Sequence, residues 1–461
     1  AVRRPRYRPI PPVVPGHRGV CRGGGARGVT GGGNACSYVG RIAREHGRER
    51  LKPRNLCPHP TGCEHGQRTE QTAVPGGAGA IALAGCTNAS DAGGASTRSY
   101  EVWAADQGLN NVHIYAPAAA GGFEEIDVID TAADGGLVPH MLDFTSDYAH
   151  VAIPFTAGGR VLVYRTADRA LIGNIETGPG SHFASFAPDD AYLTVDVIGE
   201  NRIAKVAIDW ETETFEEVDE LVMADVEHQS ADTDPVCHQF DHHGRSIHTL
   251  GPSYHDAGVV VVDHSDFSIA QSFGGEELPA NCGTVPHPTA DKFYVTAGLP
   301  TPTDHDGTPV PDASGVGEYY VLDTSGETVE IAKRGSTQGI DAHGFWFTPD
   351  VRELWVLNRE TNDGIILDPA TDEQIGTIDA FGPATAADTA QRDSPDIMWA
   401  SPDGAYMFVT LRGQSPKSGD PHAATGVNPG FAVFDIAARE RVETIIPAAG
   451  AEGSDFHGIG V

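Results

Sequence analysis

Ser401-Pro402-Asp403-Gly404-Ala405-Tyr406-Met407-Phe408-Val409 reads as a tight turn followed by an alternating run of apolar and small side chains. A Pro-Asp-Gly turn predicts a chain reversal, and alternation with a period of two predicts a strand with one buried face. Six copies of this turn and strand indicate a fold built from repeated strands. The five related strings begin at Thr145, Ala187, His242, Pro288 and Thr348.

A second repeated motif is a β-branched run that usually closes on Asp. In each copy, the number of residues between two points can be compared: the position seven residues before the Asp of the turn, and the second motif that follows it. Four of the six distances agree within two residues, and the two longer copies contain Gly-, Pro- and Asp-rich insertions at 299–316 and 411–429. The two motifs therefore share one period. The second motif occurs at Ile208-Asp209, Val262-Asp263, Leu322-Asp323, Leu367-Asp368 and Phe434-Asp435, and more weakly at Tyr164-Arg165 and Tyr115-Ala116.

The seventh copy is split between the two ends of the repeat region. The terminal segment 455–461 resembles the segment that begins at His343, and its missing strands are expected at 100–106, 112–115 and 123–129. Joining the last strand to the first blade closes the ring and removes exposed sheet edges. We therefore predict an all-β fold over 99–461, a seven-bladed β-propeller of four-stranded antiparallel blades.

These strings resemble the YVTN-repeat propellers, a family that includes lactonase-like enzymes and cell-surface proteins. The resemblance covers about four-fifths of the chain. It implies a propeller and does not imply one chemistry, because the motifs specify blades. The string 343–350 also resembles the repeats of streptogramin lyases, although the complete set of their catalytic residues cannot be matched to residues of this chain.

Charge divides the chain of 461 residues near residue 98. The formal net charge is −33, yet residues 1–98 carry +10 and residues 99–461 carry −43. The acidic balance excludes a nucleic-acid binder that works through net positive charge. The acidic, lysine-poor repeat region resembles the proteins of salt-loving archaea, so we expect a halophilic protein with an acidic surface. Residues 1–98 are predicted to be a disordered basic leader.

The leader contains a short apolar stretch, 78–86, that closes on Leu83-Ala84-Gly85-Cys86. This stretch resembles a lipoprotein signal with Cys86 as the lipid-bearing residue, followed by a polar linker. It implies a cell-surface lipoprotein outside the cytoplasm, attached to the membrane only through the lipid. The alternative is a flexible linker with a chance cysteine. The sequence contains no apolar run of about 18 residues that would span a membrane.

One column of the repeat is rich in metal-ligating side chains. The first strand of each propeller blade lines the central channel, so residues at one repeat position form one ring around the axis. The column reads His140, His182, Val236, Cys282, His343, Asp396 and His457. At its third position, the motif spacing also accepts His238 in place of Val236.

Imidazoles with a carboxylate can bind zinc or copper. Histidine-lined propeller mouths hold metal in nitrous oxide reductase and in periplasmic zinc chaperones, and the arrangement here is similar. A hydrated structural ring and an organic-ligand site remain alternatives. Four long connections are expected to overhang this mouth, namely 222–235, 299–316, 381–394 and 411–429. Cys237 and Cys282, in first strands of adjacent blades, are either a disulfide or two buried thiols.

The preferred functional hypothesis is an exported, lipid-anchored binding protein for zinc or copper. A propeller enzyme of the lactonase or lyase type, using the same histidines, is the first alternative. A surface module that binds a protein partner through its acidic loops, without chemistry, is the second. The sequence contains no phosphate-binding loop and no dinucleotide fingerprint, so no nucleotide cofactor is expected.

Overall fold

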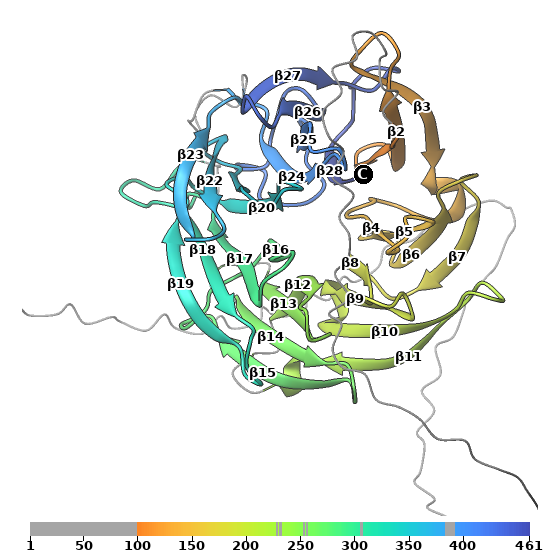
Figure 1. The fold of residues 1–461 in the computed structure, drawn as a ribbon, viewed down its shortest axis with the longest axis vertical. Helices are drawn as coiled ribbons and strands as arrows, with labels where there is room; N and C mark the ends of the chain where they lie inside the picture. The colour runs from red at the N-terminus through yellow and green to blue at the C-terminus, as the bar shows by residue number, and fades with distance from the viewer. Residues whose placement is uncertain are drawn as a thin grey trace, which may run out of the picture. The chain divides into compact units, whose positions relative to one another are not determined.

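The computed structural model describes residues 99–461 except 227, 228, 230–232, 252, 253, 255, 256, 305–307 and 383–391. In these residues the chain forms seven four-stranded sheets arranged in a ring (Figure 1). The paired strands of these sheets are antiparallel, as in the pairing of β1 with β2. The predicted seven-bladed propeller is confirmed. Cys86 and the rest of the leader lie outside the described residues.

The strands of each blade run in order from the channel to the outside. Blade 1 contains β28 (Phe456–Gly460), β1 (Val102–Asp106), β2 (Asn111–Pro117) and β3 (Phe123–Asp130); blade 2 contains β4 (Asp143–Phe144), β5 (His150–Phe155), β6 (Arg160–Arg165) and β7 (Leu171–Glu176); blade 3 contains β8 (Ser181–Phe186), β9 (Tyr192–Val197), β10 (Arg202–Asp209) and β11 (Thr214–Val222).

The remaining blades follow the same pattern. Blade 4 contains β12 (Asp234–Phe240), β13 (Ser246–Gly251), β14 (Gly258–Asp263) and β15 (Ser268–Gly274); blade 5 contains β16 (Thr284–Pro286), β17 (Lys292–Leu299), β18 (Val316–Asp323) and β19 (Glu330–Ser336); blade 6 contains β20 (Ala342–Phe347), β21 (Leu354–Asn358), β22 (Asp363–Asp368) and β23 (Glu373–Ile378); blade 7 contains β24 (Pro395–Ala400), β25 (Tyr406–Leu411), β26 (Gly430–Asp435) and β27 (Glu440–Ile445).

The hydrophobic core lies between neighbouring blades. One cluster joins β21 and β22 of blade 6 to β24, β25 and β26 of blade 7 around Trp355, Phe381 and Phe434. Middle strands such as β21 are buried along their whole length, whereas the outer strand β19 alternates between exposed and partly buried residues. Apolar runs therefore form the middle strands, and outer strands such as β19 alternate between exposed and partly buried side chains.

The quoted turn motif joins the first and second strands of a blade. The Ser401 hydroxyl donates to Asp403 Oδ1 at 2.7 Å and accepts from the backbone N–H of Tyr406 at 2.8 Å. Equivalent pairs occur at Thr348 and Asp350 (2.7 Å) and at Thr145 and Asp147 (2.8 Å). The second motif ends the third strand, as at Asp209, Asp263 and Asp435. Both predicted repeat positions are confirmed.

The ring closes as predicted. β28 at the C-terminus pairs with β1, with Trp103 opposite Gly460 and Ala104 opposite Ile459. The last strand of the chain thus becomes the innermost strand of blade 1. Three short 3-10 helices occur in the described residues, at Thr131–Asp134, Ile198–Glu200 and Met223–Asp225. No helix there is long and apolar enough to cross a membrane.

Two of the long connections reach the predicted mouth. Leu299 and Pro300, from the β17–β18 connection, and Ser418, Gly419 and Asp420, from the β25–β26 connection, line one cavity with the axial histidines. The connection between β23 and β24 is described only in part. Its Arg392 is buried and donates to the carbonyl oxygens of His422 and Thr425, which attaches it to the β25–β26 loop.

Candidate functional site

The histidine column converges on the channel axis. The ring of His140 lies 3.9 Å from that of His182 and 3.8 Å from that of His457, centroid to centroid. The rings of His343 and His457 are 5.8 Å apart and nearly perpendicular. The propeller therefore brings together four imidazoles that are up to 317 positions apart in sequence. Their role as metal ligands stays a prediction.

Asp396 lies between two imidazoles and two guanidinium groups. Its Oδ1 is 2.6 Å from Nδ1 of His343, and its Oδ2 is 3.6 Å from Nε2 of His457. Arg412 Nη1 contacts Oδ2 at 2.5 Å, and Arg359 Nη1 lies 3.7 Å from Oδ1. The contact between His343 and Asp396 lacks hydrogen-bond geometry, so His343 Nδ1 and Asp396 Oδ1 are buried without a hydrogen-bond partner.

The two arginines already have carboxylate partners of their own. Arg359 pairs with Asp341 through two bonds of 2.8 and 3.2 Å. Arg412 pairs with Asp455 through two bonds of 2.9 Å. All five side chains are buried. Each guanidinium is thus balanced by one aspartate, and the carboxylate of Asp396 remains as one negative charge in excess.

Backbone carbonyl groups orient two of the histidines. Nδ1 of His182 is 2.7 Å from the carbonyl oxygen of Val236, and Nδ1 of His457 is 3.2 Å from that of His140. A carbonyl oxygen can only accept, so each Nδ1 carries the proton and each Nε2 carries a lone pair when the ring is neutral. Nε2 is therefore the metal-binding atom available on both rings.

His140 has the opposite arrangement. The amide nitrogen of Gln107 lies 2.5 Å from its Nδ1, and the amide oxygen of Gln107 accepts from the Ser418 hydroxyl at 2.9 Å. The amide nitrogen therefore donates, and the neutral His140 ring carries its proton on Nε2. This atom is buried without a hydrogen-bond partner. His140 is consequently better suited to donate to a bound ligand than to bind a metal directly.

Burial and neighbouring charges separate the pKa values of the four histidines. Burial lowers the pKa of His182 to about 4 and holds those of His140 and His457 well below the ordinary value, which keeps these rings neutral. Burial and Arg359 also lower the pKa of His343, but Asp396 and Cys282 outweigh them and raise it to about 9. His343 is therefore the protonated member of the ring at neutral pH.

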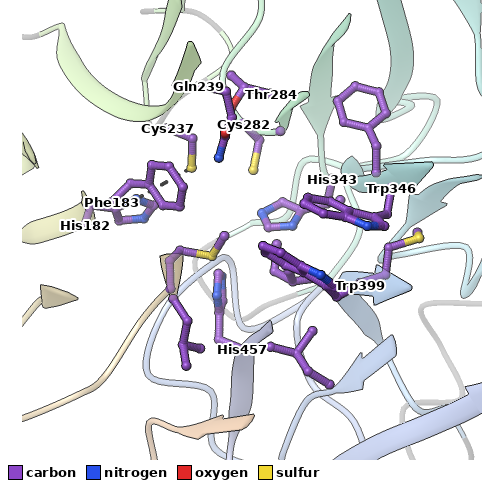
Figure 2. A pocket seen from close by; sticks show the side chains of 18 residues that line it. His182, Phe183, Cys237, Gln239, Cys282, Thr284, His343, Trp346, Trp399 and His457 are labelled. Atoms are coloured by element: carbon purple, nitrogen blue, oxygen red, sulfur yellow. Dashed lines mark hydrogen bonds between the residues drawn. The ribbon is translucent and has the colours of Figure 1, made fainter. Parts of the chain in front are cut away.

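Two cysteines complete the ring. Cys237 and Cys282 are buried free thiols, so the disulfide alternative does not hold in this structure. Sγ of Cys237 lies 3.9 Å from Nδ1 of His182. Burial raises the pKa of Cys282, but Cys237, His343 and Arg359 outweigh it and lower that pKa to about 6. Figure 2 shows both thiols between His182 and His343.

The alternative that placed His238 in the ring is wrong. His238 lies in a separate buried network, where its Nδ1 and that of His248 are each 2.6 Å from a different oxygen of Asp196. Nε2 of His238 contacts Ser185 at 2.6 Å, and Nε2 of His248 contacts Ser246 at 2.7 Å. This network joins blades 3 and 4, and its ligand atoms also lie within 4.8 Å of one another, so a metal role for His238 stays a prediction.

The ring separates a wide polar cavity from a narrow apolar one. The mouth cavity has a volume of about 480 Å³ and is lined by ring residues together with Arg359, Asn281 and Ser418. The inner cavity has about 50 Å³ and is lined largely by apolar side chains. Trp346 and Trp399 stack there with centroids 4.0 Å apart (Figure 2). His182, Cys282, His343 and His457 line both cavities.

Several site residues were not predicted. Gln107, Asp341, Arg359, Arg412 and Asp455 lie at strand ends next to the mouth and are buried. Asp341, Arg359, Arg412 and Asp455 occur one position outside a strand, where a polar residue ordinarily faces solvent. Only the register of neighbouring blades shows that they face the channel.

The fold and this site define a seven-bladed β-propeller with a histidine-ringed channel mouth. No protein-family model and no curated protein matches the chain. Among solved structures, a protein from Lactobacillus plantarum is 10% identical with a TM-score of 0.56, covering 78% of this chain and 98% of its own. These matches show the fold only, and the YVTN resemblance and the lipoprotein leader stay predictions.

Two further structures are similar at lower scores. Hydrazine synthase of Kuenenia stuttgartiensis is 14% identical with a TM-score of 0.49, over 74% of this chain and 90% of its own. A 6-phosphogluconolactonase-like protein from Bacteroides fragilis is 19% identical with a TM-score of 0.44, over 58% and 76%.

Proposed function

We propose that the chain binds a transition-metal ion, zinc first and copper second, between His343, Asp396 and His457. One observation carries this proposal. Ligand atoms of these three buried side chains all lie within 4.8 Å of one another, and Nδ1 of His343 and Oδ1 of Asp396 contact only each other, as a 2.6 Å ion pair, with no hydrogen-bond partner besides. A metal ion that replaced the proton between these two atoms would bind both of them.

The donor set suits zinc. Two imidazole nitrogens and one carboxylate oxygen are common zinc ligands, and Nε2 of His182 or a water molecule would complete a tetrahedral site. The excess charge on Asp396 also favours a cation. In the metal-free protein the proton on His343 balances that charge, so binding would release this proton.

The proposal includes the cellular setting inferred from the leader. A lipid on Cys86 would hold the propeller at the outer face of the cytoplasmic membrane, where the protein would act as a metal carrier. Mass spectrometry of the N-terminal peptide from native membranes tests this part. A peptide that begins before Cys86, with an unmodified thiol, would contradict it and leave the metal site unaffected.

Metal analysis of native protein, purified without an affinity tag or added metal, tests the site. We expect close to one zinc per chain, and we expect Asp396→Asn and His457→Gln to weaken zinc binding by roughly 100-fold or more in a competition titration. His243→Gln is the matched control, because this histidine is exposed in the turn between β12 and β13. Zinc affinity equal to wild type in both ring variants would overturn the proposal.

A second candidate function is hydrolysis by the same side chains. Cys282, His343 and Asp396 follow one another around the ring, and a thiol beside a histidine that contacts a carboxylate is the arrangement of a nucleophile with its base. Turnover of a lactone panel by metal-free protein, lost in both Cys282→Ser and His343→Gln, would favour the enzyme. Absence of turnover in a zinc-binding protein would favour the carrier.

A further inference from the structure

The two ring thiols form a structural unit that the zinc proposal does not use. We infer that Cys237 and Cys282 hold a second metal position, selective for a soft monovalent ion such as Cu(I). This position is distinct from the His343–Asp396–His457 site, and it does not require that site to bind zinc.

The backbone brings the two cysteines together across a blade boundary. Cys237 lies in β12 of blade 4, and Cys282 lies two residues before β16 of blade 5. The Thr249 hydroxyl donates to the carbonyl oxygens of both cysteines, at 3.2 Å and 2.6 Å. A single hydroxyl can reach both carbonyl groups only if the two segments run close together.

Both thiols face the channel. Cys237 and Cys282 line the inner apolar cavity, and Cys282 also lines the mouth cavity. The register of β12 shifts between Pro235 and Cys237, so that Val236 lies at the irregular position and lines the mouth cavity, while Cys237 lines the inner cavity behind it. An ion that enters the mouth therefore meets Cys282 first and Cys237 behind it.

The surroundings favour a soft ion of low charge. Thiolate and thioether sulfur select Cu(I), and Met141 and Met398 line the same inner cavity. Cu(I) is stable with two thiolates alone. Binding forms two Cu–S bonds to thiolate sulfurs; each proton that a thiol still carries is released to water, and no oxidation state changes.

A Cu(I) titration under anaerobic conditions tests this inference. The full-length chain is used with the leader cysteines Cys21, Cys36, Cys57, Cys63 and Cys86 replaced by Ser, so that Cys237 and Cys282 are the remaining thiols. Bathocuproine disulfonate serves as the competing chelator. We expect one tightly held Cu(I) per chain, reduced at least about tenfold in affinity by Cys237→Ser or Cys282→Ser.

A second measurement does not depend on the variants folding. Cu(I) added to the unaltered chain should protect the Cys237 and Cys282 peptides from alkylation, as read by mass spectrometry, whereas zinc should not protect Cys237. Three results would each overturn the inference. They are an unchanged Cu(I) capacity when Cys237→Ser and Cys282→Ser are combined, no protection of the two cysteine peptides by Cu(I), and a Cys237–Cys282 disulfide in native protein.

Metal binding at the two positions can be tested separately. Asp396→Asn should lose zinc and retain Cu(I), whereas Cys237→Ser should retain zinc and lose Cu(I). A wild-type protein that binds Cu(I) but no zinc would overturn the proposed function alone. A wild-type protein that binds zinc but no Cu(I) would overturn this inference alone.

Discussion

At the scale of single residues, Asp396 determines the charge balance of the channel mouth. Burial raises the pKa of its carboxyl, but His343, His457, Arg412 and Arg359 outweigh burial and hold that pKa well below the ordinary value. Asp396 is therefore ionised, and the two guanidinium groups hold it in place without neutralising it fully. A buried charge with this set of neighbours depends on each of them.

Arg412→Met should destabilise the fold by about 3–5 kcal/mol, because it leaves the buried Asp455 without a cation and removes the nearer guanidinium from Asp396. Chemical denaturation of the metal-free protein measures this change. Arg352→Met is the matched control, since its ion pair with Asp350 is exposed, and it should have little effect. Equal stability of both variants would contradict the assigned role of Arg412.

The folding stability should fall as the pH drops below about 6.5. Burial lowers the pKa of His248 to about 4, and burial together with His248 and Lys205 lowers that of His264 to about 3. Unfolded histidines take up protons below pH 6.5 while the folded ones stay neutral, so stability that is fully present above pH 6.5 is lost between pH 6.5 and these lower values.

Thermal unfolding midpoints measured between pH 7 and pH 4 test this dependence. His264→Gln, which cannot titrate and can still bond to Ser246, should show a shallower decline than wild type. The exposed His243→Gln should follow the wild-type curve. Identical slopes in all three proteins would show that His264 is not responsible.

At the scale of elements, the turn between the first two strands of a blade could be predicted from the sequence, whereas the register shift in β12 could not. The Ser/Thr-x-Asp turn was visible in the sequence because its hydrogen bonds are local, between residues two apart. The position of Cys237 was not visible, because the register shift in β12 depends on its pairing with β13. The repeat spacing placed Val236 or His238 in the ring; Val236 does line the mouth cavity, and Cys237 lines the inner cavity behind it.

Asp350→Ala should cost about 1 kcal/mol or less, because the Asp350 carboxylate accepts from the Thr348 hydroxyl and from the backbone N–H of Arg352. Urea denaturation measures the change. Glu330→Ala, exposed on the outer strand β19, serves as the control and should be neutral. A larger loss for Glu330→Ala than for Asp350→Ala would contradict the role of the turn.

At the scale of the whole molecule, the residues of the propeller region carry a large excess of acidic side chains. Residues 99–461 carry a net charge of −43, and outer strands such as β11 expose runs of Glu and Asp. Like charges repel one another across the surface, and the range of that repulsion falls from about 10 Å at 0.1 M salt to about 3 Å at 1 M. Salt should therefore stabilise the native state.

The thermal unfolding midpoint should rise steadily as KCl is increased from about 0.1 M to above 1 M. An isosmotic sucrose series is the control, because sucrose does not screen charge. A midpoint that is independent of KCl, or that rises equally in sucrose, would remove electrostatic repulsion as the cause. The halophilic character inferred from composition would then lack support.

The amino-acid sequence by itself determined the number of blades, the closure by β28 and the column that supplies the axial histidines. It could do so because turn chemistry and strand alternation are local and repeat with one period. Only the tertiary structure decided that Asp396 lies between Arg359 and Arg412, that Cys237 joins Cys282, and that His238 belongs to the buried Asp196 network. Those contacts form between residues on different blades, and the register across a blade boundary depends on packing that no single repeat contains.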